Sequence, residues 1–175
     1  MRFTSNIFFA GLLFISSIPS TLAGTTPAIL GFHPVSEGIF RGARPESAGL
    51  IELYNMGIKT DLNLDDDSES NSQEIKTAAT LGLNYISRPM SGFFTPDDSQ
   101  VNGTLAILAN SANYPIFVHC QHGQDRTGLI IGLHRVYNEG WAPIRAYQEM
   151  LNLGFHSFPL VFLNHYFEVK SGLED

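Results

Sequence analysis

The feature that most constrains the fold is a short apolar run that leads through a polar loop into a strongly apolar helix. Residues 116–118, Ile-Phe-Val, are continuously apolar, which suits a strand buried on both faces. Residues 129–139 predict a very apolar helix that Gly140 ends. Such a strand belongs to a parallel sheet with helices on both sides. The polar loop, residues 119–128, then lies at the carboxyl end of the strand, where α/β folds bind ligands.

The rest of the chain alternates strand and helix patterns. Residues 24–38, rich in Thr, Pro and Gly, predict an irregular lead-in, and residues 65–71 an acidic polar loop. Thr95 as a capping hydroxyl, followed by Pro96, predicts the start of a helix that runs to about residue 112. Further strands are predicted at 39–43, 58–64 (with period-two alternation) and 83–88. Further helices are predicted at 45–55, from the end of the acidic loop to about residue 81, and at 143–153 and 160–171. The prediction is an α/β fold with a central, mostly parallel four- to five-stranded sheet flanked by helices, in a single domain over residues 24–175.

The first 23 residues have the layout of a secretory signal peptide. Arg2 gives a positive start, residues 7–15 are almost unbroken apolar sequence, and Ala23 provides a small residue before Gly24. The apolar run is short for a permanent membrane span, although an uncleaved anchor is the alternative. We therefore expect export to the periplasm or the medium, cleavage near Ala23-Gly24, and no stable membrane insertion afterwards.

Charge and cysteine content narrow the function classes. Arg2 is the only charged residue in the predicted signal peptide, so residues 24–175 hold 9 Lys and Arg against 17 Asp and Glu, a formal charge of −8. Such a chain repels polyanions at long range, so we expect no nucleic-acid partner. The single cysteine, Cys120, excludes a disulfide within the chain, and its surroundings must show whether it is inert or reactive. The oligomeric state stays open.

The loop after the buried run has what a cysteine nucleophile needs. A thiol attacks a phosphate ester as the thiolate, and a helix N-terminus with a nearby cation lowers a cysteine pKa enough to form it. Cys120 precedes a predicted helix, and Arg126 follows six positions later. If the loop curls, the guanidinium returns to face the sulfur and can grip two phosphoryl oxygens. Gly123 permits the backbone angles that turn amides inward, and Thr127 can donate its hydroxyl to the sulfur.

His119-Cys120, five residues and then Arg126-Thr127 resembles the signature loop of the cysteine-based protein tyrosine phosphatase superfamily, and the small size resembles its dual-specificity branch. The resemblance implies a cysteinyl-phosphate intermediate, no metal or other cofactor, and His119 and Thr127 in supporting roles, with His119 hydrogen-bonded to the loop backbone. It also implies phosphorylated proteins or small phosphate monoesters as substrates. The implied phosphate-binding residues are Gln121, His122, Gly123, Gln124, Asp125 and Arg126.

Two sets of carboxylates compete for the role of general acid, which protonates the leaving oxygen. The resemblance implies an Asp upstream of the loop, and Asp97 and Asp98 are the candidates there, although both also suit a helix start. Asp125, inside the loop, is the other candidate, because the Asp-Arg-Thr ending resembles myotubularin-type lipid phosphatases. Asp125 could instead cap the following helix. We place Asp125 slightly ahead.

Substrate class is less constrained. Residues 121–125 contain no Lys or Arg, which favours phosphotyrosine-like or small monoesters, while the Asp-Arg-Thr ending favours phosphoinositides or inositol phosphates. Arg41, Arg44 and Arg88 could add positive charge if they reach the site. The run Asp65 to Asp67 follows a predicted strand and is therefore expected at the edge of the site, where a solvated loop is favoured over a metal site. Two other function classes remain as alternatives: a rhodanese-type enzyme, whose loop cysteine carries a persulfide, and a phosphate-binding module with weak turnover.

Overall fold

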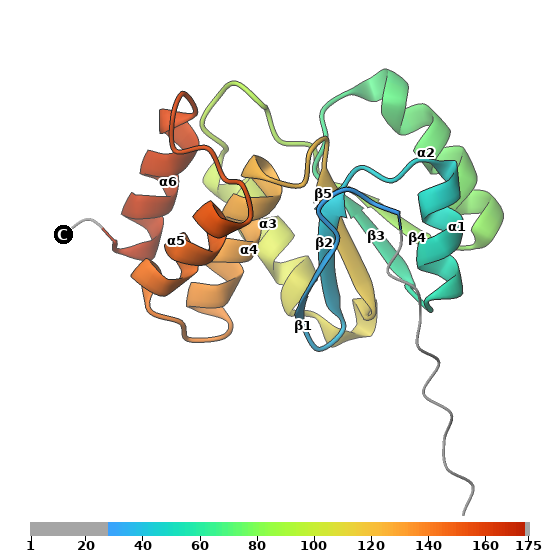
Figure 1. Ribbon diagram of the computed structural model, residues 1–175, viewed down its shortest axis with the longest axis horizontal. Coiled ribbons are helices and arrows are strands. Elements are labelled where there is room, and N and C mark those ends of the chain that lie inside the picture. Colours follow the sequence, from blue (N-terminus) through green and yellow to red (C-terminus); the bar gives the residue numbers. More distant parts are fainter. Residues whose placement is uncertain (1–27, 174–175) are drawn as a thin grey trace, which may run out of the picture.

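The computed structural model describes residues 28–173, which form one five-stranded sheet between two layers of helices (Figure 1). The strand order is β1-β2-β5-β3-β4. Strands β2, β5, β3 and β4 run parallel, and β1 pairs antiparallel with β2 at one edge. The predicted α/β architecture with a mostly parallel sheet is confirmed. The predicted signal peptide, residues 1–23, lies outside the described residues.

The strands are β1 (His33–Ser36), β2 (Ile39–Ala43), β3 (Thr60–Asn63), β4 (Asn84–Ser87) and β5 (Ile116–Cys120). The helices are α1 (Ser47–Asn55), α2 (Ser68–Leu81), α3 (Asp98–Ala109), α4 (Asp125–Tyr137), α5 (Pro143–Asn152) and α6 (Val161–Ser171), with a 3-10 turn at Ser111–Asn113. Helices α1 and α2 cover one face of the sheet, and α3 to α6 lie on the other (Figure 1). Over residues 28–173, no helix combines the length and hydropathy needed to cross a bilayer.

The central strand β5 is buried along its whole length, as its apolar sequence predicts. Ile116, Val118 and Cys120 pack into the core that α3 to α6 complete. Phe117 points the other way and packs with residues of α1 and α2. Because both faces of β5 are covered, the loop that follows it emerges at an edge of the sheet between the two helix layers.

Several element boundaries differ from the sequence-based expectation, and among them helix α2 begins at Ser68, inside the polar loop predicted at residues 65–71. Residues 33–36 form the edge strand β1 rather than an irregular lead-in. Asp97, not Thr95, is the N-cap of α3, because its carboxylate accepts the amide hydrogen bond of Ser99 at 2.7 Å. Helix α4 begins at Asp125, inside the polar loop, rather than at residue 129. Cys120, at the end of β5, and Arg126, in the first turn of α4, are therefore joined by a short turn.

The expected period-two alternation over residues 58–64 is absent within β3, where all four residues are buried. The strand lies between β5 and β4 with helices over both faces, so its polar side chains also face protein. Asp61 and Asn63 are wholly buried on the α1–α2 side. The alternation of polar and apolar residues, which is typical of a half-exposed strand, here places polar side chains inside the protein.

Candidate active site

The segment that joins β5 to α4, residues 120–126, is called the Cys120 loop here. Its turn depends on Gly123, whose φ is +71°, a left-handed conformation that side chains disfavour. A Cβ added at Gly123 would lie 2.2 Å from the carbonyl carbon and oxygen of Gly42 on β2. The loop therefore presses backbone to backbone against the neighbouring strand, and glycine alone fits.

The amides of the Cys120 loop are free to bind an anion. Within the described part of the chain, the N–H groups of residues 122–126 donate to no backbone or side-chain oxygen. They precede and begin α4, whose dipole adds positive potential at the same point. Successive unpaired amides at a helix start form the kind of concavity that binds phosphate.

Arg126 is the cation of this site. Its Nη1 donates to Asp66 Oδ1 at 2.6 Å, to the carbonyl oxygen of Met90 at 3.1 Å and to Asp65 Oδ1 at 3.3 Å. Burial disfavours the charged guanidinium, but attraction to Cys120 and to the two carboxylates outweighs this and raises the pKa of Arg126. Because all these bonds use Nη1, Nε and Nη2 have no acceptor among residues 28–173 and can take two phosphoryl oxygens.

A second arginine supports the loop from behind. Arg41 on β2 is almost completely buried, and its Nη2 donates to the carbonyl oxygen of Gly123 at 2.6 Å. Burial lowers the pKa of Arg41 to about 10, although attraction to Cys120 acts in the opposite direction. By binding this carbonyl, Arg41 holds the loop in the orientation that leaves its amides free. Arg44 does not face the loop amides and pairs with Asp65 at 2.7 Å.

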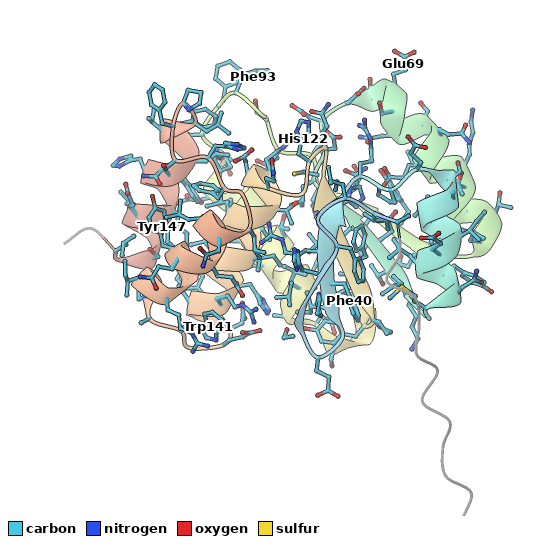
Figure 2. The ribbon with its side chains drawn as sticks, viewed as in Figure 1. Phe40, Glu69, Phe93, His122, Trp141 and Tyr147 are labelled. Carbon is cyan, nitrogen blue, oxygen red and sulfur yellow. The ribbon has the colours of Figure 1, made fainter. Side chains whose placement is uncertain are left out.

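The cavity beside the loop has a volume of about 230 Å³. Figure 2 shows that His122 and Phe93 lie at the same end of the molecule. Some of the residues that were predicted to bind phosphate line this cavity together with apolar side chains. The lining residues are Asp66, Gly92, Phe93, Gln121, His122, Asp125, Arg126, Leu160 and Leu163.

The candidate acids occupy different places. Asp125 lines the cavity, and its Oδ1 accepts the amide hydrogen bond of His156 at 2.8 Å and lies 3.0 Å from the Nδ1 atom of that histidine. Asp97 does not line the cavity and caps α3, and its bonds to Ser99 lower its pKa. Asp98 also points elsewhere and pairs with Lys170 at 2.6 Å. The structure therefore brings Asp125 together with Arg126 but leaves Asp97 outside.

The two supporting residues have surroundings that the sequence did not reveal. His119 Nε2 lies 3.1 Å from Asp61 Oδ1 and 3.0 Å from Glu74 Oε1, so its partners are buried carboxylates and not the loop backbone. Thr127 Oγ1 is buried without a hydrogen-bond partner among the residues described. The expected hydrogen bond from Thr127 to the Cys120 sulfur is therefore not formed in this structure.

Sequence reasoning missed several groups that shape the site. Asp65 and Asp66 were expected at this edge, because acidic residues directly after a parallel strand reach it, but their pairing with arginines was not predicted. The run is not the fully solvated loop that was favoured, because Asp65 is buried; Asp65 and Asp66 pair with arginines, and Asp67 caps α2. Glu74 gave no signal, because only the packing of α2 brings it to β5.

A cysteine at the end of a buried parallel strand, followed by unpaired amides at a helix start and by a guanidinium that interacts with the cysteine, defines the class as a cysteine-dependent phosphatase fold and site. Residues 28–157 match the family model described as "Tyrosine phosphatase family". The matched segment covers well over half of the sequence, and the chain belongs to this family.

Known proteins agree with this assignment. The dual specificity protein phosphatase TpbA of Pseudomonas aeruginosa is 28% identical over 141 residues, 78% of this chain and 60% of that protein. Inositol diphosphatase DSP4 of Arabidopsis thaliana is 28% identical over 109 residues, 61% of this chain and 55% of that protein. The chain thus spans somewhat more than half the length of these relatives.

Solved structures show the same fold. The core catalytic domain of the PP-IP phosphatase SIW14 from S. cerevisiae superposes with a TM-score of 0.70 at 24% identity, over 82% of this chain and 90% of that one. P. aeruginosa TpbA superposes with a TM-score of 0.68 at 22% identity, over 85% and 91% of the two chains. These likenesses support the sheet and helix arrangement described above.

Proposed function

We propose that this protein hydrolyses phosphate monoesters through a cysteinyl-phosphate intermediate and prefers phosphotyrosine-like aryl phosphates. The observation that carries the proposal is that one short loop holds Cys120, the unpaired amides of residues 122–126 and Arg126, whose charge interacts with Cys120. A phosphotyrosine complex of TpbA and the names of the other relatives support phosphate esters as the substrate class.

In the proposed reaction, the Cys120 thiolate attacks phosphorus while the bond from phosphorus to the leaving oxygen breaks. The loop amides and the free edge of Arg126 hold the three remaining phosphoryl oxygens. The leaving oxygen takes a proton from an acid, and water then cleaves the sulfur–phosphorus bond to release inorganic phosphate and regenerate the thiolate. Nε and Nη2 of Arg126 are oriented for this because Asp66, Asp65 and the Met90 carbonyl anchor Nη1.

The cavity lining favours an aromatic leaving group. Arg126 is the only Lys or Arg among its lining residues, and the carboxylates of Asp66 and Asp125 also lie there. A ligand with several adjacent phosphates finds little further attraction beside two acids. Phe93 and Leu160 supply the apolar surface that an aryl ring buries.

A substrate panel tests this preference. We expect kcat/KM for p-nitrophenyl phosphate and phosphotyrosine peptides to exceed that for inositol pyrophosphates by at least about tenfold, because one buried ring contributes roughly 1.5–3 kcal/mol. Phosphate release by the purified protein, with the Cys120→Ser protein as a blank, is the measurement. A reversed preference would assign the site to inositol diphosphates, and no release from any substrate would favour a phosphate-binding module.

We assign the general acid to Asp125. It lines the cavity, whereas Asp97 caps α3 outside it. Asp66 also lies in the cavity, but its carboxylate is paired with Arg126 at 2.6 Å. We expect Asp125→Asn to slow turnover of phenyl phosphate by about 100-fold and of p-nitrophenyl phosphate much less, because a good leaving group needs no proton.

The matched control for this prediction is Asp97→Asn, measured on the same two substrates. It should leave both rates near those of the unmodified protein. An equal loss on both substrates for Asp125→Asn would show that Asp125 acts only through its contact with His156. A leaving-group-dependent loss for Asp97→Asn would transfer the role to Asp97.

We also propose that residues 1–23 direct export, on the basis of their sequence pattern. Sequencing the N-terminus of the protein purified from its natural source should give Gly24 or a residue close to it. An intact Met1 on protein recovered from the cytoplasm would contradict export.

A further inference from the structure

Three ionisable side chains meet behind the Cys120 loop, on the α1–α2 side of the sheet. They are Asp61 of β3, Glu74 of α2 and His119 of β5. Asp61 and His119 are fully buried and Glu74 is 4% exposed. One ligand atom from each lies within 4.8 Å of the other two. The phosphatase chemistry uses none of these three side chains directly, so their accumulation in the interior needs its own explanation.

The protein itself does not satisfy these groups. Oδ2 of Asp61 and Oε2 of Glu74 are buried without a hydrogen-bond partner among the residues described, and Asp61 Oδ1 has only His119 Nε2, at 3.1 Å, as a neighbouring donor. Glu74 Oε1 is better placed, with Asn63 Nδ2 at 3.0 Å and His119 Nε2 at 3.0 Å. One Nε2 proton cannot serve two carboxylates well, and an unpartnered buried carboxylate is costly.

Charge balance points in the same direction. Two carboxylates, a neutral imidazole and a divalent cation together carry no net charge, so such an ion would leave no uncompensated charge in this dry interior.

We propose that Asp61, Glu74 and His119 form a binding site for a divalent transition-metal ion, for which zinc is the best match. Imidazole nitrogen with carboxylate oxygens is a ligand set that zinc accepts. His119 Nε2 lies 3.0 and 3.1 Å from the two carboxylate oxygens. Ligands on a tetrahedral zinc with bonds of about 2.0–2.1 Å are roughly 3.3 Å apart, so small side-chain shifts suffice. Such an ion ties β3, β5 and α2 together.

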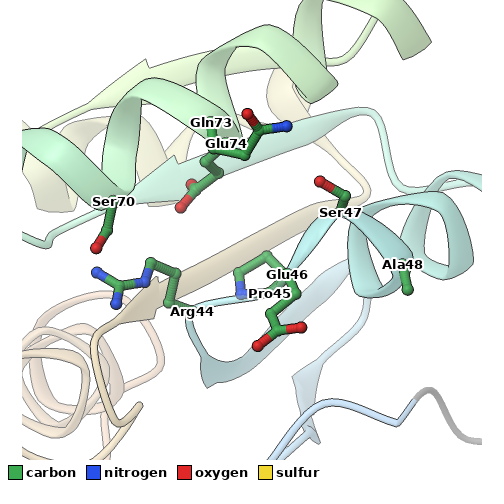
Figure 3. Close-up of a pocket in the computed structure, with 8 residues that line it drawn as sticks. All are labelled: Arg44, Pro45, Glu46, Ser47, Ala48, Ser70, Gln73 and Glu74. Carbon is green, nitrogen blue, oxygen red and sulfur yellow. The ribbon is translucent and has the colours of Figure 1, made fainter.

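Glu74 borders a cavity next to this cluster. This residue lines a cavity of about 410 Å³ together with Arg44, Ser70 and Gln73. Figure 3 shows its carboxylate directed from α2 toward the side where Arg44 and Ser70 lie. Glu74 is therefore the side of the proposed site that borders this cavity.

The site is separate from the nucleophile. His119 and Cys120 are neighbours on β5, so their side chains point to opposite faces of the sheet. His119 stacks on Phe117 toward α1 and α2, while Cys120 packs into the core with α4. The metal proposal therefore does not depend on the proposed phosphatase reaction, and each can fail without the other.

Zinc binding to the full-length Cys120→Ser protein tests the proposal, because this variant removes the thiolate as a competing ligand. The protein is stripped with a chelator at pH 8, where fewer protons compete for Nε2, and dialysed against zinc. We expect one tightly held zinc per chain by elemental analysis. The thermal midpoint should rise by about 5–10 °C at free zinc 100 times above the dissociation constant.

Glu74→Gln keeps the size of the side chain and removes its charge, and it should weaken zinc binding at least 100-fold. The control is Glu69→Gln, an exposed change in the first turn of α2, which should bind zinc as the parent does. If Glu74→Gln does not fold, X-ray absorption at the zinc edge of the parent should show one imidazole and otherwise oxygen ligands. A folded Cys120→Ser protein that retains no zinc, or equal binding by folded Glu74→Gln, would overturn the proposal, as would a coordination shell with two or more imidazoles.

Discussion

Replacing Cys120 by serine should reduce phosphate release from p-nitrophenyl phosphate by at least about 10⁴-fold, because a serine hydroxyl stays protonated where a thiol ionises. Amides of residues 122–126 and the charge of Arg126 can stabilise a thiolate on Cys120, but they cannot bring an alcohol to the same state at neutral pH. The measurement is steady-state turnover of the purified variant beside the unmodified protein.

The same variant should still fold and bind a phosphate analogue. The Cys120 side chain is 2% exposed, and the change exchanges sulfur for a smaller oxygen without altering the backbone of the loop. We therefore expect an unfolding midpoint within a few degrees of the parent and a further rise in that midpoint when phosphate is added. Normal turnover by the variant would remove Cys120 from the mechanism.

Gly123→Ala should disable the site through the backbone. The new Cβ would lie 2.2 Å from Gly42 C and O and would sit on a residue whose φ is +71°. The left-handed conformation alone costs a non-glycine residue about 1–2 kcal/mol. The backbone of β2 cannot retreat freely, because Gly42 pairs with His119 in the sheet. The loop must move instead, and its amides lose their common direction.

We expect kcat/KM of Gly123→Ala to fall at least about 100-fold, since a displacement of about 1 Å at a reacting centre has that effect. Its thermal midpoint should fall by roughly 5 °C. Gly103→Ala is the matched control, because its Cβ meets no atom within 4 Å and the residue lies within α3. That control should keep full activity and gain up to about 1 kcal/mol of stability. Unchanged kinetics for Gly123→Ala would contradict the tight contact with β2.

Local sequence patterns were sufficient for most of the fold. The apolar run of residues 116–118 predicted β5, and apolar periodicity with glycine stops predicted most of the helices. The edge strand β1 was missed because its exposed residues include His33 and Pro34, which break the apolar pattern of a strand. The start of α3 was placed at Thr95 because a capping hydroxyl and Pro96 suggested it, whereas the Asp97 carboxylate makes the cap.

Sequence by itself determined the chemical part of the site: a cysteine and an arginine six residues apart with a glycine between them at a strand-to-helix junction. This was possible because those groups lie on one continuous turn, whose geometry depends on local backbone angles. Only the tertiary structure decided which groups from other elements face that turn. Arg41, Asp66 and Glu74 come from β2, the β3–α2 connection and α2, and no sequence spacing fixes distances between separate elements of a sheet sandwich.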